Sequence, residues 1–317
     1  SFDEYLSLKG YKEDLLSGDV HKMDNALAYA LSSLGDGHTG LTGTSPLYKY
    51  GETTVDKSKY NQEKLDLDNA HEALSQARDI ANAPLGLTID EDNGVAFIAF
   101  DHFTPIDEEQ LGQDSWSKEE TLANSATLFI AAYNQLISDK YIGTIDKVVI
   151  DLATNEGGSA DSLLYILGIL LGECQYDVVD PFTGATNHTT YKVDINKDGK
   201  FDEKDISLRE YGKLIYFLDT KFAFSCGNAL PVFAKNNYPD TVRTIGQVTG
   251  GGTCIVRTSY SPLGAEYCLS GLSMLSIKDS DNNLTNIESG AKVDIPLDSE
   301  ATTLNRTAVI NAINAAK

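Results

Sequence analysis

The order of apolar segments in the middle of the chain is the feature that most restricts its fold. Residues 95–100, 147–152 and 214–218 are short runs rich in β-branched and aromatic residues. Between the first two runs, residues 122–137 have apolar side chains at helical spacing, and residues 160–171 do so between the last two. Strands that alternate with helices are typical of an α/β core, and uninterrupted apolar strands are typical of a sheet buried on both faces. We therefore expect a fold of the α/β class.

The two ends of the chain differ from this core, and the length of 317 residues allows one large domain or two smaller ones. Residues 1–34 and 66–83 have apolar residues at helical spacing, with a glycine-rich break after the first of them. Residues 242–295 are rich in strand formers, and residues 302–316 have helical spacing again. The predicted division is an N-terminal helical segment followed by an α/β core with a strand-rich C-terminal part, residues 1–85 and 86–317.

The charge of the chain excludes some classes of partner. Lys and Arg number 25 against 47 Asp and Glu, which gives a formal net charge of -22. This balance argues against binding to nucleic acid or to an anionic membrane surface. The longest apolar run, residues 163–171, is about half of the roughly 18 residues that a membrane span needs. The first residues lack the basic, apolar and small-residue order of an export signal, and we expect an extracellular or cell-surface protein from which that signal has been removed.

The four cysteines fit no metal-binding spacing and are too few for a disulfide scaffold. Cys254 and Cys268 stand in consecutive strand-like runs and could pair across a hairpin. A bond between Cys226 and Cys254 is a second interpretation. Buried thiols, Cys174 included, are the third, and the sequence leaves all three open.

A serine stands where the apolar run 214–218 is followed by a helical segment over residues 227–236. At such a turn the hydroxyl of Ser225 lies at a helix N-terminus, where unpaired backbone N–H groups and the helix dipole favour negative charge. Acyl transfer produces an oxyanion that needs fixed donors of this kind. The simpler interpretation is an N-cap serine, which is common.

Two further segments have the glycine pattern of a turn that contacts a ligand. Residues 150–158 end a strand in Gly157 and Gly158, which lets backbone N–H groups approach a ligand closely. This suits the second donor of an oxyanion site, although a plain strand-to-helix turn is an equally good interpretation. His38 follows a glycine-rich break, where an imidazole is well placed to act as a general base. His102, at the end of a strand, is the rival base.

Taken together and in this order, these segments resemble the C-terminal processing peptidases, also called tail-specific proteases, and their tricorn-like branch. Members of that family have an Asp-Gly-His-Thr segment, here residues 36–39, and a turn of the form Ile-Asp-Leu-Arg-Asn-Asn-x-Gly-Gly, here residues 150–158. Their nucleophilic serine lies at a strand-to-helix turn, here Ser225, and precedes a Gly-x-x-Thr-x-Gly segment, here residues 246–252. The resemblance extends over most of the chain, residues 30–297.

The resemblance implies roles for particular residues. In the Ser-Lys members a lysine in the segment after the nucleophile is the base, and the aligned position here is Gly252. The tricorn-like members instead use a histidine from the early segment, supported by a glutamate before a Gly-x-x-Pro-Asp-Ile run near the end. Residues 287–296 match that run closely enough to assign the role to Glu288. The implied nucleophile, general base and orienting carboxylate are Ser225, His38 and Glu288.

The resemblance further implies a crotonase- or ClpP-like core of stacked β-β-α units, with oxyanion donors from the backbone N–H groups of Gly157, Gly158 and Cys226. Many members carry a PDZ domain before the Gly-Gly strand, whereas residues 42–94 are too short and too helical for one. We therefore expect a secreted serine endopeptidase that acts on peptide or protein substrates without an organic cofactor. The alternatives are a catalytically inactive relative that binds peptide ends, or a calcium-dependent cell-surface interaction protein.

One acidic cluster, residues 194–205, matches the twelve-residue calcium loop of EF-hands, with Gly199 at the sharp turn. Asp205 replaces the usual glutamate at position 12, as in dockerin modules, although a dockerin has two such loops and this chain has one. We expect one structural Ca²⁺ that ties an insertion near residues 175–210 to the core; an ordinary turn between strands is the alternative. The predicted ligands are Asp194, Asn196, Asp198, the carbonyl of Lys200, Asp202 and Asp205.

Overall fold

The computed structural model describes residues 1–46, 55–113, 115–279 and 281–316 of the chain. Two compact units can be distinguished, and each is described by itself. Unit 1 comprises Ser1–Glu72 and Cys254–Met274, and unit 2 comprises Ala73–Thr253 and Leu275–Lys317. Two elements, α4 (Gln62–Ile80) and β10 (Glu266–Lys278), contribute residues to both units.

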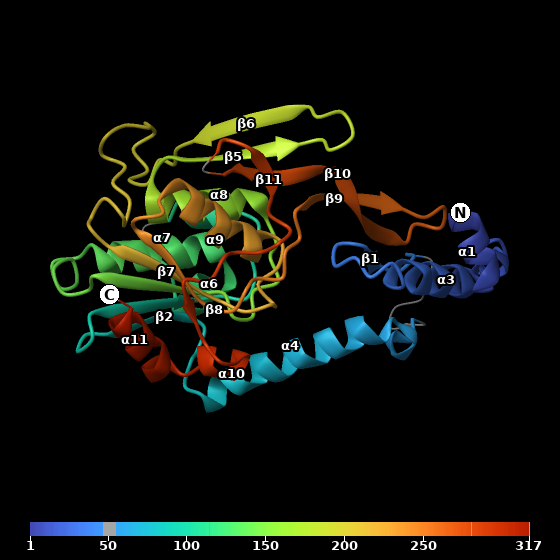
Figure 1. Ribbon diagram of the computed structural model, residues 1–317, viewed down its shortest axis with the longest axis horizontal. Coiled ribbons are helices and arrows are strands. Elements are labelled where there is room, and N and C mark those ends of the chain that lie inside the picture. The colour runs from blue at the N-terminus through green and yellow to red at the C-terminus, as the bar shows by residue number, and fades with distance from the viewer. Residues whose placement is uncertain (47–54, 114, 280, 317) are drawn as a thin grey trace. The chain divides into compact units, whose positions relative to one another are not determined.

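Unit 2 contains a six-stranded sheet in the order β12-β8-β7-β4-β3-β2. Figure 1 labels β2, β7 and β8 of this sheet. Its strands are β2 Gly86–Asp90, β3 Val95–Ala99, β4 Lys147–Asp151, β7 Leu214–Asp219, β8 Val242–Gly246 and β12 Ile295–Pro296. All neighbouring pairs are parallel except β2 and β3, which are antiparallel. The central strands are buried over nearly their whole length, as their uninterrupted apolar runs predict.

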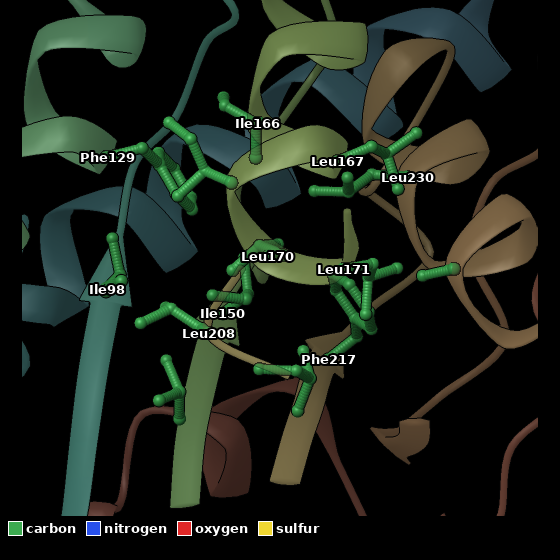
Figure 2. Close-up of a cluster of buried hydrophobic side chains, with 14 of the residues drawn as sticks. Ile98, Phe129, Ile150, Ile166, Leu167, Leu170, Leu171, Leu208, Phe217 and Leu230 are labelled. Carbon is green, nitrogen blue, oxygen red and sulfur yellow. The ribbon is translucent and has the colours of Figure 1, made fainter. Parts of the chain in front are cut away.

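Helices cover both faces of this sheet. The described helices of unit 2 beyond α4 are α5 Glu108–Leu111, α6 Lys118–Ala123, α7 Ser125–Leu136, α8 Ala160–Leu171, α9 Cys226–Asn237, α10 Glu300–Thr303 and α11 Arg306–Ala315. Helices α7, α8 and α9 pack on one face in the larger core. Figure 2 shows side chains of α8 beside those of three strands, with Ile166, Leu167, Leu170 and Leu171 near Ile98, Ile150 and Phe217. Helix α11 packs on the other face through Val309, Ile310 and Ile313.

Unit 1 consists of helices and a β-hairpin. Its helices are α1 Phe2–Leu8, α2 Tyr11–Leu15 and α3 Val20–Ser32, and the first part of α4 follows a 3₁₀ turn at Lys57–Lys59. Strand β9 (Cys254–Tyr260) pairs with the first part of β10, which also pairs with β1 (Gly40–Gly43). Gly10 and Gly18 adopt positive φ angles and separate α1, α2 and α3, so the predicted helical stretch 1–34 is three helices and not one.

The predicted insertion near residues 175–210 contains an antiparallel hairpin of β5 (Cys174–Val179) and β6 (Thr186–Tyr191), followed by the acidic loop. Further along the chain, the last residues of β10 pair with β11 (Leu284–Asn286). In the β9–β10 hairpin, Cys254 faces Met274 and Cys268 faces Thr258, so these two cysteines are not opposed. All four cysteines of the chain are thiols in the structure.

The structure confirms the predicted α/β class and the strands and helices of the central region. The crotonase- or ClpP-like arrangement stays a prediction. In the stretch 42–94 the described residues form the end of β1, the 3₁₀ turn, α4 and β2, while residues 47–54 lie outside the described part. Among the described helices, none combines the length and apolar character needed to cross a membrane.

Candidate active site

Ser225 occupies a strained turn between β7 and α9 in unit 2. Its φ and ψ angles are 56° and −119°, and it is one of four described non-glycine residues with positive φ. The other three are two asparagines and a lysine in exposed turns, whereas Ser225 is half-buried at the N-terminus of a buried helix. Its hydroxyl makes no capping hydrogen bond to α9. Strain of this kind at a side chain that the helix does not use is typical of functional sites, and it disfavours the interpretation as an ordinary N-cap.

The Gly-Gly turn after β4 lies directly against Ser225. A Cβ atom on Gly157 would stand 2.7 Å from the Cβ of Ser225 and 3.0 Å from the amide nitrogen of Cys226. Two hydrogen bonds join the turns, because the Phe224 amide donates to the Asn155 carbonyl at 3.0 Å and Cys226 Sγ donates to the Gly158 carbonyl at 3.2 Å. The structure thus brings together two segments that are about 70 residues apart, and only glycine fits at the point of contact.

The backbone N–H groups at this junction differ in availability. The Gly157 amide donates to Asn155 Oδ1 at 2.9 Å, which fixes the turn. Among the described residues the amides of Gly158 and Cys226 have no hydrogen-bond acceptor. Of the three predicted oxyanion donors, Gly158 and Cys226 are therefore the two with an unused N–H group beside Ser225.

Cys226 is a buried neutral thiol and not an alternative nucleophile. Burial raises its pKa to about 11, and its contacts with the Gly158 carbonyl and the Ser225 side chain offset this only in part. A cysteine acts as a nucleophile through its thiolate, which a raised pKa suppresses at neutral pH. Its Sγ instead helps to hold the two turns together.

Glu288 contacts the segment that follows the nucleophile, also within unit 2. Its Oε2 accepts hydrogen bonds from the amides of Gly252 at 3.2 Å and Thr253 at 2.9 Å. The neighbouring Gly251 carbonyl accepts from the Ser225 amide at 2.9 Å. One short segment, residues 251–253, therefore touches both the predicted nucleophile and the predicted carboxylate.

Gly252 has no room for the lysine of the Ser-Lys members. Its φ is 89°, and a Cβ there would lie 2.8 Å from both the Ser225 amide nitrogen and the Phe224 ring. A side chain at this position would displace the backbone of the nucleophile turn. A lysine at position 252 is therefore excluded as a base.

His38 belongs to unit 1, where it follows α3 and precedes β1. It is half-buried and lines a cavity of about 200 Å³ together with Ser32, Tyr60 and Lys64. The Asp36 carboxylate accepts from the His38 amide at 3.2 Å and from the Thr39 hydroxyl. Burial opposes ionisation of Asp36, but these hydrogen bonds and one with Ser270 outweigh it and lower its pKa. The Asp-Gly-His-Thr segment is thus a tight turn built around an ionised aspartate.

His102 is the histidine that unit 2 places beside the Gly-Gly turn. Its Nε2 lies 2.9 Å from the position that a Cβ on Gly158 would occupy, and its side chain is exposed. Phe103, the next residue, joins the turn through hydrogen bonds with Gly157 and Ser159 of 2.8 and 2.7 Å. His102 therefore stays the rival of His38 and needs a test of its own.

A buried ionic cluster beneath the Gly-Gly turn was missed by the sequence reasoning. Asp151, at the end of β4, is fully buried and accepts hydrogen bonds from Arg78 of α4 at 3.0 and 3.1 Å. Arg306, the first residue of α11, lies 2.8 Å from the same carboxylate and stacks 4.3 Å from the centre of the Phe97 ring. Arg78 also donates to Thr154 Oγ1 at 3.0 and 2.8 Å. An aspartate ending a buried apolar strand was the available signal, since such a charge requires a partner.

Asp219, at the end of β7, is a second fully buried carboxyl group. Among the described residues neither of its side-chain oxygens has a hydrogen-bond partner. Burial raises its pKa well above the usual value, and the charge of nearby Asp151 raises it further. Asp219 therefore keeps its proton to a higher pH than an ordinary aspartate does.

The acidic loop of residues 194–205 is closed by its own side chains. Asp194 accepts from the amides of Asp198 at 3.2 Å and Gly199 at 2.8 Å, and the Asp205 carboxylate accepts from Ile195 and Asn196. The loop is anchored by the buried side chain of Ile195. Within the described ranges, no three histidine, cysteine, aspartate or glutamate side chains converge closely enough to hold a metal ion.

Comparisons with known proteins give a fold and no family. No protein-family model matches the sequence, and no curated protein matches it. A candidate peptidase from Parabacteroides merdae is 13% identical, with a TM-score of 0.54 over 99% of this chain and 88% of that chain. A lipoprotein from Streptococcus agalactiae is 13% identical, with a TM-score of 0.51 over 99% of this chain and 89% of that chain. At these identities the similarity is one of fold.

A weaker match is a candidate S41 protease from Bacteroides fragilis. It is 14% identical, with a TM-score of 0.44 over 70% of this chain and 55% of that chain.

Proposed function

We propose that this chain is a serine peptidase whose nucleophile is Ser225. The observation that carries the proposal is the strained φ of 56° at a half-buried serine that starts a helix and touches the Gly-Gly turn. Nucleophilic serines of hydrolases stand on strained strand-to-helix turns because the hydroxyl is thereby held out from the backbone, next to free N–H donors. The fold shared with a candidate peptidase agrees with this assignment.

The proposed reaction is acyl transfer through a covalent intermediate. His38 takes the proton from Ser225 Oγ as this oxygen attacks the peptide carbonyl carbon, and the N–H groups of Gly158 and Cys226 stabilise the oxyanion. His38 then protonates the leaving amine, and water releases the acyl group by the reverse sequence. Glu288 is proposed to accept a hydrogen bond from the other ring nitrogen of His38, which would fix its tautomer.

Hydrolysis of a fluorescently labelled casein by purified Ser225→Ala tests the proposal. Loss of the nucleophile should lower kcat by about 10³-fold or more. Ser159→Ala is the matched control, because Ser159 also starts a buried helix without a side-chain cap but has an ordinary φ of −67°. Full activity in the Ser225 variant, or equal loss in both variants, would refute the assignment.

We further propose that the loop of residues 194–205 binds one Ca²⁺ in a structural role. What supports this is the sequence spacing of its donor set, which is that of a calcium loop: Asp194, Asn196, Asp198, the Lys200 carbonyl, Asp202 and Asp205. Ca²⁺ would have to draw together carboxylates that accept backbone N–H groups in the structure. Gly199 has the positive φ, 79°, that the sharp turn needs. The hairpin and loop lie between α8 and β7, so a bound ion would stabilise an insertion into the core.

A further inference from the structure

A cavity in unit 2 lies along α9, on the side of Pro231 and Val232. It has a volume of about 610 Å³, which is within the roughly 300–1,000 Å³ of small-molecule sites. Pro239, the end of β10 at Ile277 and the loop at Ala291 complete its apolar lining. Nothing in the proposed peptidase reaction uses this cavity.

Lysines surround this apolar cavity. Lys235 already has partners: its Nζ forms an ion pair with Asp294 at 2.5 Å and donates a hydrogen bond to the Lys292 carbonyl at 3.0 Å. Lys278 and Lys292 are exposed, and in the described part of the chain no carboxylate lies within 4.0 Å of either ammonium group. Two unpaired cations beside one apolar cavity are notable in a chain of net charge -22.

The acidic residue of the lining, Asp279, offsets one of these two lysine charges but pairs with neither lysine, so with Lys235 and Asp294 paired the lining keeps one net positive charge. The Asp279 carboxylate accepts hydrogen bonds from the amides of Asp281 and Asn283, at 2.9 and 2.8 Å. These bonds lower its pKa and hold it in its own turn. An anion entering the cavity would therefore meet two ammonium groups that no carboxylate pairs with, and a lining whose net charge is positive.

We infer that this cavity is a binding site for a small amphipathic anion, a carboxylate on an apolar body. Val232, Ile277 and Ala291 would contact the apolar body, and Lys278 and Lys292 would hold the carboxylate as mobile point charges. An uncharged apolar molecule would leave both cations unused. A small hydrophilic anion would leave the apolar lining exposed to water. The site is distinct from the peptidase proposal and does not depend on it.

The probes are octanoate, 1-octanol with the same chain and no charge, octylamine with the opposite charge, and acetate with the same head group. Isothermal titration calorimetry on the full chain should detect octanoate and none of the other three at the same concentration. Binding should also protect Lys278 and Lys292, but not Lys9, from acylation by an amine-reactive ester followed by mass spectrometry. Equal binding of octanol, or no binding of octanoate at millimolar concentration, would overturn the inference.

A pair of charge reversals locates the site. Lys278→Glu with Lys292→Glu should raise the Kd for octanoate at least about tenfold, because two attractions become repulsions. Lys9→Glu with Lys22→Glu makes the same charge change in unit 1 and should leave the Kd unaltered. Equal affinity in wild type and the first double variant would contradict the inference, whatever the activity toward casein. Conversely, a Ser225→Ala protein that keeps its octanoate affinity would separate this site from the peptidase proposal.

Discussion

The buried carboxylate of Asp151 should be a major determinant of the stability of unit 2. Asp151→Asn keeps the shape of the side chain and removes its charge. In the structure this carboxylate is fully buried. The two arginines beside it are also largely buried, since the Arg78 side chain is 4% exposed and the Arg306 side chain 15% exposed. The variant would leave two buried cations without their anion.

The size of the effect follows from the burial. Removing one partner of a buried ion pair costs roughly 3–5 kcal/mol in the free energy of unfolding. For a unit of this size such a loss lowers the thermal midpoint by about 6–20 °C. The dependence on pH has a definite sign. Burial works against ionisation of Asp151, but Arg78 and Arg306 outweigh it and lower its pKa. Its stabilising effect is thus complete above the unfolded value of about 3.9 and is lost as the pH falls through the folded pKa.

Urea and thermal unfolding followed by circular dichroism measure this effect. The control is Glu91→Gln, which makes the same change of charge in the exposed pair with Lys140, whose atoms lie 2.8 Å apart, and should leave the midpoint unchanged. The difference between wild type and Asp151→Asn should be full at pH 7 and should shrink below about pH 4. Equal midpoints for wild type and Asp151→Asn at pH 7 would refute the reasoning.

Four further predictions concern other residues of the account. The Asp219→Asn variant should be as stable as wild type near pH 4 and increasingly more stable than wild type as the pH rises. The pKa of Asp219 is raised in the folded state, so ionisation of this group in the unfolded chain of wild type opposes folding. A difference in unfolding midpoints that stays constant across pH would contradict this. Gly158→Ala should abolish casein hydrolysis, since a Cβ there would stand 2.2 Å from the Phe103 carbonyl oxygen; retained turnover would oppose the assigned turn. His38→Ala should lower kcat by about 10³-fold or more, while His102→Ala should change it little; the opposite result would make His102 the base. Ca²⁺ at a hundredfold excess over its Kd should raise the thermal midpoint by about 5–10 °C. Asp194→Asn should remove this rise, whereas Asp180→Asn, at an aspartate outside the loop that also accepts backbone hydrogen bonds in a turn, should keep it; an unresponsive wild type would refute the calcium proposal.

Much of the core could be read from the sequence because its signals are local. The strands at 95–99, 147–151 and 214–219 are uninterrupted apolar runs, and such runs predict buried parallel strands without knowledge of their partners. The β5–β6 hairpin was missed because Thr186–Tyr191 is polar and largely exposed, which leaves no apolar alternation to detect. The grouping of β9 and the start of β10 with the N-terminal helices depends on pairing across more than 200 residues, such as Gly40 with Cys268.

Part of the candidate site could also be predicted from local sequence signals. Glycines at 157 and 158 mark a close backbone approach, and the structure shows Ser225 at that approach. Only the resemblance pointed to Glu288, and it did not predict the contacts of this carboxylate with the amides of residues 252–253. Of the Arg78–Asp151–Arg306 cluster only Asp151 gave a sequence signal, as a charge that ends a buried strand; its two arginine partners could not be identified because they are far from it in the sequence.

The claim on which the account depends is that Ser225 is an activated nucleophile. Incubation of the native chain with a fluorophosphonate, followed by tryptic digestion and mass spectrometry, tests this directly, because the reagent forms a stable adduct only with an activated hydroxyl. The account predicts one adduct per chain, on Ser225, which disappears after heat denaturation. An unmodified Ser225, or modification spread over several serines, would contradict it.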